Sequence, residues 1–444
     1  MASESVRERM AEVEKAILDR APEHDLVPSL DRIRDVAALL GDPQAAFRAV
    51  HVTGTNGKTT TVRLTERLLR EHGLRTGRFT SPHLVDVRER IAIDGEPLSP
   101  EQFVATYDDV VPYVDLVDAR RAGEPRMTFF EVLVAMAYAA FADAPVEVAA
   151  VEVGMGGTWD ATNVLDAQVA VVTPIALDHQ RFLGSDVASI AGEKSGIIKP
   201  GAVAVLADQQ PEAARVLLER CAEVGATVVR EGVEFGVAAR EIAVGGQVVS
   251  LEARGRYDDV FLPLHGEHQA HNAAFAVAAV EALLGADAGL DAEVVRAALA
   301  DADSPGRLEI VRRGPTVLVD AAHNPAGAAV LADAVRESFT FTRLVGIVGV
   351  LADKDAEGIL GALEPVLDEV VVTRSRSPRA IDPDELGEIA VDVFGEDRVH
   401  VAARLDDAID VAFGRAEEGG LVGGGVLATG SITLAADVRR LLLR

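Results

Sequence analysis

Residues 51–61 read HVTGTNGKTTT, and this stretch decides the fold of the first half of the chain. Residues 48–53 have the pattern of a short strand, and residues 59–72 have helical spacing, with leucines on one face. The glycines between them predict a tight turn that leads the strand into the helix. Backbone N–H groups at such a turn and helix start form a nest for phosphate oxygens. The stretch therefore predicts a phosphate-binding loop.

Two side chains of this loop have the chemistry to bind a nucleotide. Lys58 can reach β- and γ-phosphates, and the Thr59 hydroxyl can approach Mg²⁺. The usual P-loop pattern has glycine six residues before the lysine, where this chain has Val52. We therefore interpret the loop as a variant P-loop that is more compact on the strand side.

The remaining sequence alternates strand-like and helix-like segments, which predicts an α/β fold with mostly parallel sheets. Nearly continuous apolar runs at 146–153 and 168–173 are typical of strands buried on both faces. Alternating patterns and turns over 227–264 indicate a small β excursion.

The domain organisation follows from this alternation and from one Asp-, Ser-, Pro- and Gly-rich segment. We expect a P-loop-type ATPase domain over residues 1–299 and a hinge linker at 300–306. A second, Rossmann-like α/β domain is expected over 307–444. Its strands are expected at 316–320, 344–350, 369–373 and 425–429.

The composition narrows the function classes. The chain has 444 residues, of which 49% are hydrophobic and 26% charged, and no apolar run reaches the roughly 18–20 residues of a membrane span. Its net charge of −28 disfavours nucleic-acid binding, because phosphates would be repelled. Cys221 is the only cysteine, so an intrachain disulfide and a cysteine metal cluster are excluded. No secretory signal is visible, and we expect a cytoplasmic protein without membrane partners.

Lysine is scarce in this acidic chain. It occurs only at positions 15, 58, 194, 199 and 354, so arginine supplies nearly all the positive charge. This balance is typical of proteins from cells with molar internal salt, where a Debye length of roughly 3 Å screens surface repulsion. A halophilic-like origin is therefore one hypothesis, and solubility alone is the alternative.

Three charged or titratable residues of the first domain suggest a catalytic site. Glu152 ends the strand at 146–153, at the sheet edge where ligands bind, and its carboxylate is a suitable ligand for Mg²⁺. His179 follows the next strand in the same way. Lys194 would lose its proton in a desolvated site, and its neutral amine could react with CO₂ to give a metal-bridging carbamate. The alternatives are a solvated strand end, a structural histidine and a solvated lysine.

The second domain also contains charged and titratable residues that suggest a site. Asp320 ends a predicted strand, and His323 lies where a helix is expected to begin. Arg307 follows Ser-Pro-Gly at the expected domain junction, where a guanidinium can reach anionic phosphates. A surface charge is the alternative for Arg307.

Eleven motifs in order resemble the Mur ligase superfamily, and most closely the folylpolyglutamate synthase / dihydrofolate synthase family. The resemblance covers the chain from about residue 20 to its C-terminus. The motifs are HVTGTNGKTTT (51–61), TSPHL (80–84), TFFE (128–131), EVGMGGTWDATNV (152–164), DHQRFLG (178–184), EKSGIIKPG (193–201), HQAHNAAFA (268–276), SPGR (304–307), DAAHNP (320–325), LADKD (351–355) and TGS (429–431).

The resemblance implies roles for individual residues. The residues implied to bind ATP are Thr55, Asn56, Gly57, Lys58, Thr59, Asn272, Arg307 and Asp320. Those implied to hold Mg²⁺, with two ions expected, are Ser81, Glu152, His179, Thr59 and a carbamylated Lys194. Lys58, Lys194 and His323 are expected to be catalytic. Those expected to face the pterin are Thr128, Phe129, Phe130, Glu131, Thr158, Trp159 and Asp160.

One segment departs from the family pattern. The family commonly has Gly-Gly-Arg-Leu-Asp-Ala-Thr-Asn, whereas this chain has Thr158-Trp159 in place of Arg-Leu. The departure affects the expected pterin contacts more than the ATP chemistry. Trp159, the only tryptophan, either stacks on a planar ring or packs in the core.

The expected reaction is an ATP-dependent ligation through an acyl phosphate. A folate or dihydropteroate carboxylate would attack the γ-phosphate of ATP, and the amine of L-glutamate would then displace phosphate. Two alternatives stay open, a peptidoglycan-precursor ligase and a nucleotide-gated binding protein without catalysis. We expect a monomer whose partners are these small molecules and not nucleic acid.

Overall fold

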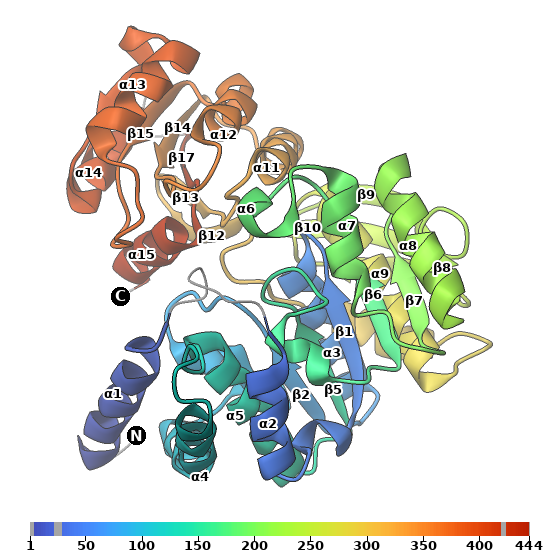
Figure 1. Cartoon of the computed structure of the whole chain (residues 1–444). Coiled ribbons are helices and arrows are strands. Elements are labelled where there is room, and N and C mark those ends of the chain that lie inside the picture. Colours follow the sequence, from blue (N-terminus) through green and yellow to red (C-terminus); the bar gives the residue numbers. More distant parts are fainter. Residues whose placement is uncertain (1–3, 22–28, 419–422, 444) are drawn as a thin grey trace. The chain divides into compact units, whose positions relative to one another are not determined.

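The computed structural model of the chain describes residues 4–21, 29–418 and 423–443 (Figure 1). The chain forms two compact units. The first comprises Met1–Glu241, Val248–Pro263 and Ala270–Ala302, and the second comprises Ile242–Gln247, Leu264–Gln269 and Asp303–Arg444. The hinge expected at 300–306 stays a prediction.

The main sheet of the first unit has eight strands in the order β4-β3-β2-β5-β1-β6-β7-β8. From β2 to β8 in this order the neighbours are parallel, and β3 and β4 add an antiparallel edge. The strands are β1 (Arg48–Thr53), β2 (Thr76–Phe79), β3 (Ile91–Ile93), β4 (Glu96–Pro97), β5 (Val148–Glu152), β6 (Val169–Val172), β7 (Val203–Leu206) and β8 (Thr227–Arg230).

The central strands bring their carboxyl ends to one edge of this sheet. Every residue of β5 and β6 is buried, as their apolar runs predict. In the β1 register, Val52 pairs with Glu152 on one side and with Val171 on the other. The segments that follow β1, β5 and β6 therefore begin next to one another.

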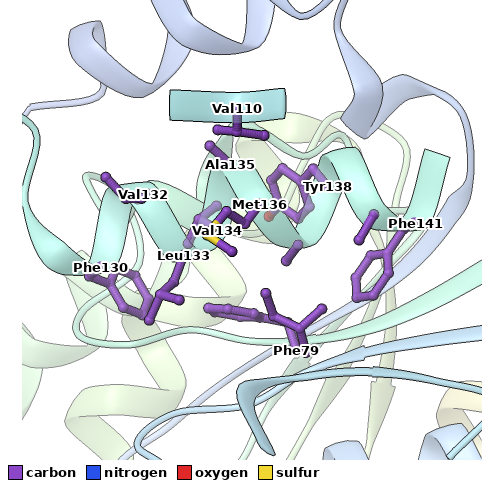
Figure 2. Packing of buried hydrophobic residues seen from close by; sticks show 14 of the residues in the cluster. Phe79, Val110, Phe130, Val132, Leu133, Val134, Ala135, Met136, Tyr138 and Phe141 are labelled. Atoms are coloured by element: carbon purple, nitrogen blue, oxygen red, sulfur yellow. The ribbon is translucent and has the colours of Figure 1, made fainter. Parts of the chain in front are cut away.

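Helix α5 forms much of the core of the first unit. It is apolar on all sides and almost completely buried, as expected for a helix enclosed by other elements. Figure 2 shows Phe79 of β2 on one side of α5 and Val110 of α4 on the other. The helices up to residue 300 are α1 (Glu4–Leu18), α2 (Asp31–Leu39), α3 (Lys58–Glu71), α4 (Pro100–Arg120), α5 (Phe129–Asp143), α6 (Gln180–Leu183), α7 (Val187–Ser195), α8 (Pro211–Val224), α9 (Glu267–Leu284) and α10 (Ala292–Ala300), with 3-10 turns η1 (Pro43–Ala45), η2 (Val87–Arg90) and η3 (Ala161–Val164).

The expected β excursion at 227–264 is shorter than the sequence suggested. Strand β8 belongs to the main sheet, because the crossover through α8 returns the chain beside β7 and parallel to it. A separate three-stranded sheet in the order β11-β10-β9 contains β9 (Gly236–Ala243), β10 (Gly246–Glu252) and β11 (Arg256–Leu262).

The second unit contains a six-stranded sheet in the order β12-β13-β17-β14-β15-β16, which is parallel except for β12. This arrangement confirms the Rossmann-like fold class. Its elements are β12 (Glu309–Arg313), β13 (Thr316–Val319), α11 (Pro325–Ser338), β14 (Arg343–Val348), α12 (Ala356–Leu363), η4 (Glu364–Val366), β15 (Glu369–Val372), α13 (Pro383–Phe394), η5 (Glu396–Arg398), β16 (Val399–Val401), α14 (Leu405–Glu417), β17 (Gly424–Thr429) and α15 (Ile432–Leu442). Within the described parts of both units, no helix has the length and apolar character needed to span a membrane.

Candidate active site

The phosphate loop connects β1 to α3 and depends on two glycines. Gly54 has φ 149°, and a Cβ there would lie 1.8 Å from Thr173 Oγ1. Gly57 has φ 88°, and its Cβ would lie 2.5 Å from Asn272 Oδ1. At both positions the backbone conformation favours glycine, and an added Cβ would collide with a neighbouring side chain. The loop can therefore take this shape only because these two residues have no side chain.

The segment after β6 supports the loop from behind. The Thr55 N–H donates to the Pro174 carbonyl at 3.0 Å, and the Thr55 hydroxyl is 3.0 Å from both the Ala176 carbonyl oxygen and its amide nitrogen. The Thr173 hydroxyl donates to the Asn56 carbonyl at 2.7 Å. The loop backbone is thus fixed by contacts far away in sequence, and its conformation is preorganised.

Two lysines approach the same carbonyl group in this loop. Lys58 Nζ lies 3.1 Å from the Gly54 oxygen and 3.0 Å from the Thr55 oxygen. Lys194 Nζ, which comes from α7, donates to the Gly54 oxygen at 2.8 Å. Lys58 thus provides positive charge at a loop where a polyphosphate would bind, and Lys194 adds to this charge only when its amine is protonated.

Lys194 is almost completely buried, with 4% of its surface exposed. Burial and the nearby charge of Lys58 lower its pKa to about 7, although Asp178, Asp160 and Glu193 act in the opposite direction. A substantial fraction of the amine is therefore neutral at neutral pH. A neutral amine is the form that reacts with CO₂.

Glu152 occupies the carboxyl end of β5, where the sequence placed it. Glu152 is 1% exposed, and its carboxylate accepts hydrogen bonds from the Thr59 hydroxyl at 2.8 Å and from the Ser81 N–H at 3.1 Å. A carboxylate beside a hydroxyl suits a hard cation. In the described parts of the chain, no three His, Cys, Asp or Glu side chains gather into a group that could hold a metal. A Mg²⁺ ion here would therefore also need hydroxyl, water or phosphate oxygens.

His179 lies at the start of the short helix α6, in a left-handed conformation with φ 49°. The backbone N–H of His179 donates to Asp178 Oδ1 at 2.8 Å, and the ring Nε2 is 3.9 Å from Asp178 Oδ2. About a third of the side chain is exposed. The ring is therefore accessible, and Asp178 is its acidic neighbour.

The segment with Thr158 and Trp159, where the sequence departs from the family pattern, packs against α7. Thr158 donates to the Glu193 carbonyl through its N–H at 2.9 Å and through its hydroxyl at 3.0 Å. The backbone N–H of Trp159 donates to Glu193 Oε1 at 3.2 Å, and the partly buried Trp159 side chain packs against the apolar cluster that contains Val153 and Ile190. The Trp159 contacts that the structure shows are thus with the core.

Several residues expected to face the pterin also have contacts within the protein. Glu131 forms a buried ion pair with Arg32, with Nε–Oε1 at 3.0 Å, and also accepts the Thr128 N–H at 2.8 Å. The Phe130 ring packs at a tilt against the Phe79 ring, with ring centroids 5.8 Å apart. The Phe129 ring lies under the Arg90 guanidinium at 4.8 Å. These contacts fix the start of α5.

The predicted residues of the second unit form a cluster of their own at the end of β13. Asp320 is buried and accepts the N–H groups of Leu308 at 2.8 Å and Ala322 at 2.7 Å. Burial raises the pKa of Asp320, while Arg307, the two N–H groups and His323 oppose this shift. His323 Nδ1 lies 3.0 Å from the Ala321 carbonyl oxygen.

The structure thus gathers Thr55–Thr59, Ser81, Glu152, Lys194 and Asn272 around one loop. Sequence reasoning missed Thr53 and Thr173, whose hydroxyls hold the neighbouring backbone at the ends of β1 and β6. A threonine at the end of an otherwise apolar strand was the available signal.

Comparisons with known proteins define the class. Residues 52–280 match the Mur ligase middle domain family, and residues 306–432 match the Mur ligase glutamate ligase domain family. The chain therefore belongs to the Mur ligase family. A Mycobacterium tuberculosis relative named dihydrofolate synthase/folylpolyglutamate synthase is 51% identical, over 98% of this chain and 94% of the relative. The chain belongs to the dihydrofolate synthase/folylpolyglutamate synthase family, which confirms the family and ligase class expected from its motifs.

Two solved structures support the same assignment. Mycobacterium tuberculosis folylpolyglutamate synthase complexed with ADP has a TM-score of 0.94 and 50% identity, with 99% of both chains covered. E. coli FolC in complex with DHPP and ADP has a TM-score of 0.82 and 31% identity, with 98% of this chain and 97% of that chain covered. Adenine nucleotide binding in these relatives agrees with the ATP site expected here.

Proposed function

We propose that this chain joins L-glutamate to the carboxylate of dihydropteroate and to that of folates, at the expense of ATP. The relative at 51% identity has both activities in its name. The observation that carries the proposal is the approach of Lys58 and Lys194 to the Gly54 carbonyl, in a P-loop beside the buried Glu152.

In the first step, a substrate carboxylate oxygen attacks the γ-phosphorus of ATP. The new P–O bond forms as the bond to the β–γ bridging oxygen breaks, so ADP leaves with the electron pair. The product is an acyl phosphate, which has the leaving group that a free carboxylate lacks. Lys58 and the loop N–H groups would stabilise the charge on the transferred phosphoryl group.

In the second step, the α-amine of glutamate attacks the acyl carbon. The C–N bond forms, the C–O bond to phosphate breaks, and the amine loses a proton. The protein contributes position and a dry, charged environment rather than covalent chemistry. We assign the proton transfer to His323 as a proposal, because it is the titratable side chain next to Asp320.

We propose that Thr59, Ser81, Glu152, His179 and a carbamylated Lys194 hold Mg²⁺. The ion would neutralise the phosphates when it is bound. The proposal is supported by the buried carboxylate of Glu152 with a hydroxyl at 2.8 Å, and by the lowered pKa of Lys194.

The remaining roles are proposals of the same kind. Asn272, Arg307 and Asp320 would contact the nucleotide, and residues 128–131 and 158–160 would line the pterin site. Within these segments, Glu131 and Asp160 are buried and hydrogen-bonded, whereas Thr158 is exposed and Trp159 is partly exposed, so we place the substrate contacts on Thr158 and Trp159 first. We also propose that the protein is cytoplasmic and that it is a monomer. Its mass in solution would test the monomeric state.

Release of inorganic phosphate from ATP tests the proposal. We expect release only when L-glutamate and either dihydropteroate or a folate are both present, at low or molar salt. Lys58→Ala should lower the rate by about 100-fold or more, because it removes the phosphate's cationic partner. Lys15→Ala, which removes an exposed lysine, should leave the rate unchanged.

The same assay separates the alternatives. Turnover with a peptidoglycan-precursor carboxylate and not with a pterin would make the chain a different Mur-type ligase. ATP binding without turnover on any acid would make it a binding protein.

A further inference from the structure

Strand β1 carries two buried polar side chains on the same face, at positions two residues apart. His51 and Thr53 are both completely buried in the middle of the main sheet. The Thr53 hydroxyl donates to the Gly156 carbonyl at 2.8 Å, and His51 Nε2 lies 2.8 Å from Thr162 Oγ1. Both therefore hold the segment 154–163, which follows β5. Burial of a polar ring costs free energy, so an apolar residue would be the simpler filler for this space.

The hydrogen-bond pattern fixes the form of the histidine. Thr162 has one hydroxyl hydrogen, which it donates to the Asp160 carboxylate in a short bond. Its oxygen must then accept from His51, so the histidine hydrogen is on Nε2. Nδ1 is buried and has no hydrogen-bond partner among the described residues. Burial, together with the charge of Lys199, lowers the pKa of His51 to about 3, and the ring is neutral.

Asp160 forms hydrogen bonds near both ends of the segment 154–163. Its carboxylate also accepts the N–H of Met155 at 2.9 Å and that of Thr162 at 2.9 Å. The two ends of the segment are thus held by one side chain, whose position depends on Thr162 and, through it, on His51.

The segment in turn sets the position of α7. The Thr158 N–H donates to the Glu193 carbonyl at 2.9 Å. At Gly157 an added Cβ would lie 2.8 Å from the Lys194 carbonyl oxygen, so the two backbones are in direct contact. The next link is the contact of Lys194 Nζ with the Gly54 oxygen at 2.8 Å.

We infer that His51 is a positioning residue for the ligation reaction, acting through Thr162, Asp160 and the segment 154–163 on Lys194. The inference rests on the proposed function, because it assumes that Lys194 takes part in catalysis. His51 touches no substrate in this role and transfers no proton. Its neutral Nε2–H serves as a fixed donor in a series of hydrogen bonds and backbone contacts that ends at Gly54.

Isosteric variants test this role in the full-length protein. Thr162→Val removes the hydroxyl and keeps the shape, whereas Thr162→Ser keeps the hydroxyl. His51→Leu removes the donor, and His51→Gln retains an N–H near the position of Nε2. The matched control is Thr65→Val, because the buried Thr65 hydroxyl on α3 has no hydrogen-bond partner among the described residues.

The assay is steady-state kinetics at a temperature where melting curves show every variant to be folded. We expect Thr162→Val and His51→Leu to lower kcat about tenfold or more while KM for ATP stays within about twofold, because a misplaced catalytic group weakens transition-state binding. Thr162→Ser and His51→Gln should recover most of the loss, and Thr65→Val should equal the wild type.

Three results would overturn the inference. These are an unchanged kcat in Thr162→Val, a Thr162→Ser variant as impaired as Thr162→Val, or an equal loss in Thr65→Val. If Thr162→Val fails to fold, the His51→Gln and His51→Leu pair decides, since equal activity of these two would reject the donor role. Absence of turnover in the wild type would instead reject the proposed function.

Discussion

The side-chain nitrogen of Lys194 lies 2.8 Å from the carbonyl oxygen of Gly54, although 140 positions separate the two residues in the sequence. Gly54 opens the phosphate loop, and Lys194 belongs to α7. Through this contact a buried lysine of lowered pKa lies against the loop that we propose to bind the nucleotide phosphates. The chemistry of the loop therefore depends on a residue that the P-loop pattern alone would not reveal.

Gly54→Ala should abolish ATP binding, because its Cβ would overlap Thr173 Oγ1 at 1.8 Å and its φ of 149° disfavours any side chain. Gly192→Ala on α7 is the control, since a Cβ there meets nothing within 4 Å. That control should gain roughly 0.5–1 kcal/mol of stability, the usual advantage of alanine over glycine in a helix. Calorimetric titration with ATP measures the first effect, and wild-type affinity in Gly54→Ala would refute this account of the loop.

Lys194 should make stability depend on pH. The folded protein releases the Lys194 proton near pH 7, whereas the unfolded chain keeps it to about pH 10.5. Between these values the unfolded state binds more protons, so the contribution of Lys194 to stability rises with pH. The unfolding free energy of the wild type minus that of Lys194→Met should increase by up to about 1.4 kcal/mol per pH unit from pH 7 to 10, and stay constant below 7.

Urea unfolding in bicarbonate-free buffer measures this difference without interference from a carbamate. Lys15→Met, at an exposed position, should show no such window. Parallel curves for the wild type and Lys194→Met would mean that the buried amine titrates as it does in water.

Glu152→Gln keeps the shape of the side chain and removes its charge. If Glu152 holds Mg²⁺, the Mg²⁺ concentration for half-maximal activity should rise by about tenfold or more, because a neutral amide is a weaker ligand for a hard cation. Glu147→Gln, at an exposed position just before the same strand, is the matched control. An unchanged Mg²⁺ requirement in Glu152→Gln would remove this residue from the metal site.

Glu131→Gln should destabilise the fold rather than weaken substrate binding alone. Both side chains of the Arg32–Glu131 pair are 5% exposed, and loss of one partner in a buried ion pair costs about 3–5 kcal/mol. The double variant Arg32→Met/Glu131→Met should recover much of this loss, because it removes both charges of the buried pair together. Urea unfolding measures both effects. Unchanged stability in Glu131→Gln, with a raised KM for the pterin, would place Glu131 at the substrate instead.

The sequence predicted the parts of the fold whose signals are local. Strand β1 has the boundaries that its pattern indicates, and α3 begins at Lys58, one residue before the expected start. The edge strands β3 and β4 and the helices α1, α2 and α4 were not predicted. Strands of two or three residues contain too few positions to show an alternating pattern. The three amphipathic helices lack a strong apolar run.

The candidate site could be predicted only in its residue types. A carboxylate at the end of a buried strand pointed to Glu152, and the resemblance to the family motif at 193–201 pointed to Lys194. The contact of Lys194 with Gly54 and the burial of Glu131 against Arg32 depend on tertiary packing, which no local pattern contains. For the same reason, sequence reasoning gave no role to His51, whose partner Thr162 is 111 positions away.

The most direct test of the central claim follows oxygen through the reaction. Dihydropteroate labelled with ¹⁸O in its carboxylate is incubated with the protein, ATP and L-glutamate, and the inorganic phosphate is analysed by mass spectrometry. An acyl-phosphate route transfers one labelled oxygen from the carboxylate to each phosphate released. Unlabelled phosphate, or label in AMP, would contradict ligation through an acyl phosphate at this site.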